Sequence, residues 1–279
     1  MTIDMSTTRT DLALESVQAA RSGAEAGTIS EVRSRERTRE GYAVTDIRVE
    51  DEDGAQALGK PVGRYVTVDL GPYFRREADY FDRGVRCLAG ELAALLPEGP
   101  VLAAGLGNRA MTCDAVGPAS IDNLLVTRHM IRAMPRQFAD FRPVAAVCPG
   151  VLARTGLEAL ELVRGAVERV RPAAVIAVDA LAARDSARLC ATVQLSDTGL
   201  VPGSGVGNRR SALDRGTLGV PVIAVGIPTV VDADPRAGLF LTPRDIDQRI
   251  RELGRLLGYG ITLALQPSLT AADVTALLG

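Results

Sequence analysis

From residue 80 onward, short runs of apolar residues alternate with longer stretches in which apolar positions recur every three or four residues. The runs at residues 101–104 and 173–178 are apolar at every position, which is typical of strands buried on both faces of a parallel sheet. Residues 156–170 repeat their apolar side chains at the spacing of one helix face. This alternation predicts an α/β fold of three layers, α/β/α, around a mainly parallel twisted sheet.

The same pattern places the remaining elements of the fold. Strands are predicted at residues 42–49, 65–70, 101–104, 144–147, 173–178, 191–195 and 220–225. Helices are predicted at residues 82–96, 118–134 and 156–170, and from Thr242 onward. The first two strands precede the alternating part of the chain, so we expect them to be extra N-terminal strands.

Two polar stretches near the N-terminus predict surface structure. Residues 31–40 contain four Arg and three Glu with alternating signs, which indicates a solvated helix or linker. Residues 51–54 read Asp-Glu-Asp-Gly and predict an acidic turn. The sequence shows neither an internal repeat nor an interior domain boundary, so we expect a single folded domain.

The composition excludes several classes of function. The formal net charge of the 279 residues is −2, which gives no broad attraction to nucleic acid or to a membrane surface. No apolar stretch reaches the roughly 18 residues that cross a bilayer, and the first residues lack the apolar core of a signal peptide. The four cysteines form no CxxC pair, which argues against a zinc ribbon or a thioredoxin-type site. We therefore expect an intracellular protein.

Two aspartates follow buried strands and are the strongest candidates for chemistry. Asp114 lies in the Gly-rich segment GLGNRAMTCDAVGP at residues 105–118, and Asp179 directly follows the apolar run at 173–178. Two carboxylates at short range do not both ionise cheaply, so one holds a proton as general acid while the other is a general base for water. The alternative is structural: Asp114 caps a turn, and Asp179 binds backbone amides at a strand end.

A second Gly-rich segment at residues 196–210 is predicted to be a loop over the active site. It lacks the GxxxxGK[ST] spacing of a phosphate-binding loop, and its Asp197 is a candidate third acidic group. The single histidine, His129, is expected to be a packed or capped residue. A GxSxG nucleophile motif and an HExxH zinc motif are both absent from the sequence.

Five motifs in order resemble the spore germination protease family. They are GLGN with DAVGP, DNLLVTRH at residues 122–129, VDALAAR at 178–184, PGSGVGN at 202–208 and GIPTVVDA at 226–233. The resemblance implies a phosphorylase/hydrolase-like α/β fold and an atypical aspartic endopeptidase. Its substrates would be the small acid-soluble spore proteins that coat DNA, degraded in the spore core, the forespore cytoplasm, during germination. The two essential aspartates of the family fall on Asp114 and Asp179.

The resemblance also implies a tetrameric zymogen that is cut once near its N-terminus. The matching segment is RTDLALE at residues 9–15, so the cut falls between Asp11 and Leu12. Residues 1–11 would then be a propeptide and residues 12–279 a single peptidase domain. Neither a cofactor nor direct binding of nucleic acid or membrane is expected. Substrate binding is assigned to the following residues: Asn108, Asp197, Gly203, Ser204, Gly205 and Arg209.

Two departures from the family bear on the turn before Asp114 and on the oligomer, and a second resemblance leaves other functions open. Cys113 stands where the family usually has proline, and a long insertion that larger relatives carry after residues 231–233 is missing here. Residues 105–114 also resemble the nickel-hydrogenase maturation proteases. The first alternative is therefore a metal-dependent processing peptidase with Asp114 and Asp179 as ligands. The second alternative is a spore binding protein without enzymatic activity.

Overall fold

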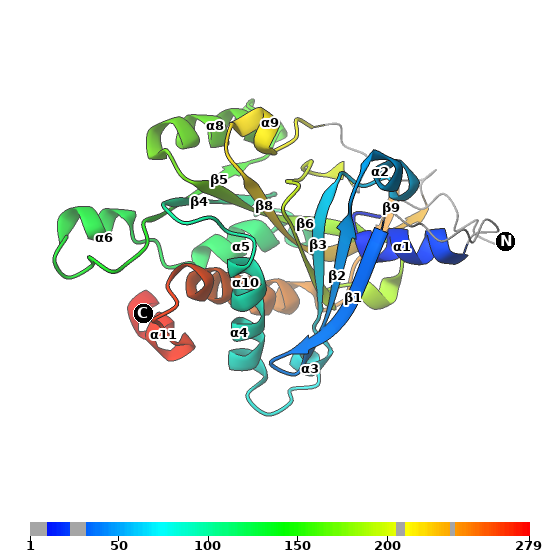
Figure 1. The fold of residues 1–279 in the computed structure, drawn as a ribbon, viewed down its shortest axis with the longest axis horizontal. Coiled ribbons are helices and arrows are strands. Elements are labelled where there is room, and N and C mark those ends of the chain that lie inside the picture. Colours follow the sequence, from blue (N-terminus) through cyan, green and yellow to red (C-terminus); the bar gives the residue numbers. More distant parts are fainter. Residues whose placement is uncertain (1–9, 23–31, 205–209, 235–237) are drawn as a thin grey trace.

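The central element of this computed structural model is one mixed sheet (Figure 1). The structure describes residues 10–22, 32–204, 210–234 and 238–279. Within these residues nine strands form the sheet, in the order β1-β2-β3-β7-β8-β6-β4-β5, with β9 paired to β8. The four strands at one end are parallel to one another: β5 (Val144–Gly150), β4 (Val101–Leu106), β6 (Ala174–Ala183) and β8 (Val222–Asp234).

The other end of the sheet is antiparallel. It contains β7 (Thr192–Ser196), β3 (Gly63–Asp69), β2 (Tyr42–Val49) and β1 (Val32–Arg39), and the short β9 (Leu239–Leu241) pairs with β8. β7 joins this antiparallel half to the parallel half, because it pairs with β3 on one side and with β8 on the other. The extra N-terminal strands therefore extend the sheet away from the parallel part.

Helices cover both faces of the sheet, which confirms the predicted α/β/α architecture (Figure 1). One face packs against α4 (Tyr80–Ala93), α5 (Val116–Asp122) and α10 (Ile246–Leu265). The other packs against α8 (Ala159–Val170), α9 (Arg215–Leu218), α1 (Ala13–Ser22) and α2 (Glu52–Leu58). The remaining short helices are α3 (Gly71–Phe74), η2 (Thr112–Asp114), α6 (Arg128–Ala133), α7 (Leu152–Thr155), η3 (Ser186–Arg188) and α11 (Ala271–Leu278).

Strand β4 shows why a buried parallel strand can be apolar at every position. Val101 and Ala103 belong to the core under α4, α5 and α10, whereas Leu102 and Ala104 belong to the core under α8. Successive side chains of a strand point to opposite faces, so a strand covered on both sides has no solvent-facing position.

Three local predictions were wrong. Residues 32–39 of the predicted helix or linker form the edge strand β1, and Glu31 lies outside the described residues. The acidic turn at 51–54 is the start of α2, since the Asp51 side chain accepts a hydrogen bond from the Gly54 amide as an N-cap. The helix predicted at 118–134 is divided into α5 and α6, and in the segment between them the Leu125 amide donates to Thr262 Oγ1 (3.1 Å).

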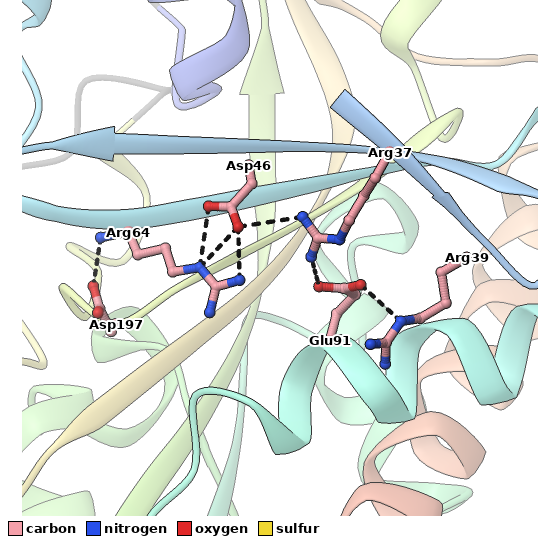
Figure 2. A network of polar contacts seen from close by, with 6 residues as sticks. All are labelled: Arg37, Arg39, Asp46, Arg64, Glu91 and Asp197. Carbon is pink, nitrogen blue, oxygen red and sulfur yellow. Dashed lines mark hydrogen bonds and ion pairs between the residues drawn. The ribbon is translucent and has the colours of Figure 1, made fainter. Parts of the chain in front are cut away.

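A charged network holds β1 against the rest of the molecule (Figure 2). Glu91 of α4 is 1% exposed and pairs with both Arg37 and Arg39 of β1. Asp46 of β2 pairs with Arg37 (3.2 Å) and with Arg64 of β3 (2.7 Å). Edge strand β1 is therefore fixed by ion pairs with distant residues in addition to its ladder with β2, which explains how so polar a segment becomes a strand.

Candidate active site

Asp114 is held by a tight loop after β4. The loop turns at Gly107, where φ is +107° and an added Cβ would lie 2.0 Å from the backbone oxygen of Asp114. Only glycine fits at this position, because it has no Cβ and tolerates positive φ. The Asn108 amide donates to the backbone oxygen and to Oδ2 of Asp114, both at 2.9 Å. The loop therefore closes on itself and fixes the Asp114 carboxylate.

Gly117 places this loop over the ends of two parallel strands. A Cβ at Gly117 would lie 2.2 Å from the oxygen of Leu106 in β4 and 2.5 Å from that of Val178 in β6. From the other side, Thr229 of β8 donates its hydroxyl to the Cys113 oxygen (2.6 Å). Residues from β4, β6 and β8 thus position the Asp114 turn next to Asp179, the residue that follows Val178 in β6.

Asp179 is a buried carboxylate within β6, opposite Gly226 of β8. Its Oδ1 accepts a hydrogen bond from the Ala180 amide (3.0 Å). Burial raises the pKa of Asp179 well above its ordinary value, and the nearby charge of Asp114 raises it further. Burial also raises the pKa of Asp114 to about 6, although the hydrogen bond from Asn108 opposes this. The pair therefore retains a proton at pH values where isolated aspartates are fully ionised.

The two aspartates line one cavity, together with Asn108, Gly203 and Asp11. Its walls are largely apolar and include Leu106, Met111, Val151, Leu152, Ala159, Leu181 and Val230. A second cavity is lined by Asp11, Asp179 and Gly203 as well, and adds Lys60, Gln194 and Ser204. The two cavities adjoin and together form the cleft: they share Asp11, Asp179 and Gly203, and Asp114 lines the first of them.

The N-terminal segment of the chain itself lies in this cleft. The Asp11 amide donates to the Ala182 oxygen (2.9 Å), and the Ala182 amide donates back to Asp11 Oδ2 (2.8 Å). Ser204 Oγ donates to the other carboxylate oxygen, Asp11 Oδ1 (2.7 Å). Lys60 Nζ donates to the carbonyl oxygen of the preceding residue, Thr10 (3.0 Å). The Asp11 side chain is therefore bound at both oxygens beside the catalytic candidates.

The residues after Asp11 are held as firmly. Leu12 is fully buried in an apolar cluster that contains Leu181, Ala183, Leu189 and Val231. Glu15 is also buried and accepts hydrogen bonds from the backbone amides of Arg184 (2.7 Å) and Asp185 (2.9 Å) and from the Thr10 hydroxyl. The end of β6 and the turn after it thus bind this segment at the positions of Asp11, Leu12 and Glu15.

The structure brings three of the six residues assigned to substrate binding into the cleft. Asn108 and Gly203 line it, and Ser204 contacts Asp11. Asp197 lies outside it, because its carboxylate accepts a hydrogen bond from the Arg64 amide (2.8 Å) at the edge of β3 (Figure 2). Gly205 and Arg209 fall outside the described residues.

Of two other polar residues, His129 differs from its prediction and Cys113 agrees with its sequence context. His129, expected to be packed or capped, is exposed on α6 and lines neither cavity. Cys113 does line the cavity, but burial and the adjacent Asp114 raise the pKa of its thiol, which disfavours a thiolate nucleophile.

Gln194 and Lys60 contact the N-terminal segment and were missed by sequence reasoning. Gln194 is the middle residue of the β7 sequence TVQLS, where its buried side-chain amide lies between two apolar residues, Val193 and Leu195. An uncharged polar residue within a predicted buried strand is a weak indication of a functional role. It is the one feature of the sequence that could have pointed to Gln194. Lys60 carries no comparable signal, because lysines are common on surfaces.

The described residues show neither a metal-binding cluster nor a membrane-spanning helix. In that part of the chain no group of three or more His, Cys, Asp or Glu side chains is arranged to hold a metal ion. None of the helices there is long and apolar enough to cross a membrane.

Comparison with known proteins shows the family. A family model described as germination protease matches residues 9–238. The chain belongs to the germination protease family. It is 40% identical to the germination protease of Caldanaerobacter subterraneus subsp. tengcongensis and 35% identical to that of Clostridium perfringens, in each case over 97% of this chain and 98% of the relative. The expected activity, a peptidase of spore germination, is confirmed.

Two further comparisons describe the extent of the similarity. The chain is 39% identical to the germination protease of Bacillus cytotoxicus over 95% of its own length and 76% of the relative. Among solved structures, a [NiFe] hydrogenase maturation protease, HycI from Thermococcus kodakarensis, matches with a TM-score of 0.42 and 18% identity. That match covers 63% of this chain and 99% of the other.

Proposed function

We propose that this member of the germination protease family is an aspartic endopeptidase in which Asp114 and Asp179 act on one water molecule. The observation that supports the pair most directly is that both carboxylates line the cleft in which Asp11 of the same chain is bound. A peptide segment with an acidic residue at its centre therefore already occupies the space next to the dyad.

The pKa values suggest a division of roles within the dyad. Asp179 is the more deeply buried, and its pKa is raised both by burial and by the charge of Asp114, so it is assigned the shared proton and the role of general acid. Asp114, with a pKa of about 6, is ionised at neutral pH and is assigned the role of general base for water. The two groups titrate as a coupled pair, so these roles describe the form with one proton.

The bound segment supports a zymogen that is cut between Asp11 and Leu12. Residues 1–11 would be the propeptide and residues 12–279 the peptidase domain. The carboxylate of Asp11 is held by Ser204 and by the Ala182 amide, and the side chain of Leu12 is enclosed in an apolar cluster. A site that binds an acidic residue before the cut and an aliphatic residue after it is suited to substrates with the same sequence. The small acid-soluble spore proteins are the proposed substrates, in the spore core, and a tetramer is the proposed assembly.

The test is cleavage by the purified full-length chain. Incubation at neutral pH should yield a product that begins at Leu12, detected by intact-mass spectrometry, and a purified small acid-soluble spore protein added to it should be degraded. Asp114→Asn and Asp179→Asn should abolish both reactions. Asp122→Asn, which removes an exposed carboxylate on neighbouring α5, should not.

Each alternative predicts a different result in this assay. A metal-dependent peptidase would lose its activity in a chelator and regain it with added divalent metal. A binding protein without enzymatic activity would leave both the chain and the spore protein intact. Undiminished cleavage by Asp114→Asn or Asp179→Asn would refute the aspartate pair.

A further inference from the structure

One side chain bridges the peptide bond at which the cut is proposed. Gln194 Nε2 donates to the carbonyl oxygen of Asp11 (3.0 Å), and Gln194 Oε1 accepts from the amide of Ala13 (2.7 Å). The amide group therefore contacts the chain on both sides of Leu12. The carbonyl that it contacts belongs to the Asp11–Leu12 bond.

The position of Gln194 is fixed by its surroundings. It is only 8% exposed and lies in β7 between Thr67 of β3 and Gly226 of β8. Its orientation follows from the hydrogen bonds, because the Ala13 amide requires an acceptor and the Asp11 carbonyl requires a donor. A buried side chain with both of its polar atoms engaged has little freedom to turn away, so the N–H group is aimed at the carbonyl before any reaction begins.

We propose that Gln194 is a catalytic residue that donates a hydrogen bond to the carbonyl oxygen of the bond being cut. The inference rests on the proposed function, cleavage between Asp11 and Leu12. As water adds to the Asp11 carbonyl carbon, the C=O π electrons move to oxygen, and the Nε2–H group stabilises the negative charge that develops there. Asp114 takes the proton from the water. The C–N bond then breaks and the Leu12 nitrogen receives a proton from Asp179, which leaves a carboxylic acid group on Asp11 and an amine on Leu12.

The chemistry of an amide suits this position. A neutral donor stabilises charge on the carbonyl oxygen without pairing with the carboxylates of the dyad or of Asp11, as a lysine or arginine there would. Both contacts of Gln194 are to backbone atoms. The same contacts are therefore open to any substrate, while recognition of sequence falls to the groups that bind the Asp11, Leu12 and Glu15 side chains.

The chain supplies a matched control in Gln266. This residue is also buried, and it binds a backbone segment in the same two-sided way: the Arg142 amide donates to its Oε1 (2.9 Å) and its Nε2 donates to the Arg142 oxygen (2.8 Å). Gln266 follows α10 and lines neither cavity of the cleft. Loss of its amide has the structural cost of removing a buried glutamine without touching the bond to be cut.

The experiment compares Gln194→Met, Gln194→Glu and Gln266→Met in the full-length chain. Gln194→Met removes both hydrogen bonds at similar volume, whereas Gln194→Glu keeps an acceptor for Ala13 and loses the donor. Measurements are the first-order rate of self-cutting and, for the processed enzyme, kcat and KM on a peptide with the sequence of residues 7–18. Both Gln194 variants should lower kcat about 100-fold, with a smaller change in KM. Gln266→Met should leave kcat within about three-fold of wild type, and thermal unfolding of all three variants is measured alongside.

The outcomes separate this inference from the proposed function. A wild-type chain that leaves the Asp11–Leu12 bond intact refutes the proposed function and this inference with it. A wild-type chain that cuts, beside folded Gln194 variants that cut at the same rate or faster, refutes the role of Gln194 alone. A rise in KM with unchanged kcat also refutes it, because Gln194 would then bind substrate without stabilising the transition state. If Gln194→Met does not fold, Gln194→Glu decides the matter.

Discussion

Glu15 should determine which peptides this enzyme accepts, because two backbone amides in the turn after β6 bind its carboxylate. The perturbation is a Glu→Gln change at the position of Glu15 in the peptide with the sequence of residues 7–18. In the bound segment the carboxylate accepts from the amides of Arg184 and Asp185 and from the hydroxyl of Thr10. A glutamine keeps one oxygen acceptor, and its NH₂ group then faces one of the two backbone N–H donors.

The size of the effect follows from these contacts. A hydrogen bond to a charged group contributes about 1.5–3 kcal/mol, and a buried donor left without a partner costs about 1–3 kcal/mol. Relaxation of the bound peptide around the substituted side chain reduces the sum of these two contributions. We therefore expect a loss of about 2–4 kcal/mol in the free energy that stabilises the transition state. That range corresponds to a fall in kcat/KM of about 30- to 1,000-fold.

The assay is steady-state cleavage of the two peptides by the processed enzyme, followed by chromatography. A third peptide, with Lys at the position of Gln18, changes the net charge by the same amount at a position that is exposed in the structure. It should be cut within about three-fold of the parent peptide, as is usual for surface positions. A Gln peptide cut as fast as the parent would refute the reasoning that backbone amides recognise this carboxylate.

Three further predictions concern the dyad, the cleft and the fold. The first-order rate of self-cutting should rise as the pH rises through about 6, because the pKa of Asp114 is raised to about 6 and the ionised form is the base; a rate that is flat across this range contradicts the assignment. Ser204→Ala should slow self-cutting about 10-fold by removing a hydrogen bond to a carboxylate, as measured by intact-mass spectrometry. Arg37→Ala should lower the free energy of unfolding by about 3 kcal/mol in urea, because buried Glu91 loses a partner, whereas Arg33→Ala at an exposed ion pair should cost less than about 1 kcal/mol.

The parallel half of the fold and the placement of Asp114 and Asp179 in one cavity could be predicted from the sequence because their causes are local. A strand that is covered on both faces must be apolar throughout, so the run before Asp179 indicates its own position in the sheet. The same run makes the first polar residue after it conspicuous. Asp114 was found for the equivalent reason, since a Gly-rich turn after such a strand has few structural explanations.

Strand β1 could not be predicted because its stability comes from residues far away in the sequence. Its positions 33, 35, 37 and 39 are all arginine, and the pattern lacks an apolar face. What makes it a strand is the ladder with β2 and the ion pairs to Glu91, which is 52 or more residues away on α4 (91 − 39 = 52; Figure 2). The partner is evident only after folding, so charge alternation alone favoured a solvated helix or linker.

Gln194 was missed for a related reason: its role depends on a segment about 180 residues earlier in the chain. A single glutamine in a strand carries no chemistry of its own. It gains a function from the carbonyl placed against it, and that carbonyl belongs to residues that sequence reasoning treated as a cleavage site alone. Residues that contact a bound backbone are in general harder to find than carboxylates, because a backbone leaves no matching pattern in the sequence.

In the proposed reaction, the contacts of the bound segment divide at the cut. Asp11 leaves with the propeptide, and with it go the hydrogen bonds from Ser204 and Ala182. Leu12 and Glu15 remain covalently part of the enzyme and keep their apolar cluster and their backbone amides. Leu12 is the new N-terminus of the enzyme, and it still fills the part of the site that binds residues C-terminal to the cut bond. A substrate in a second turnover must therefore displace it. It follows that a free peptide with the sequence of residues 12–22 should compete with substrate, and that its inhibition should weaken when Glu15 in that peptide is replaced by Gln.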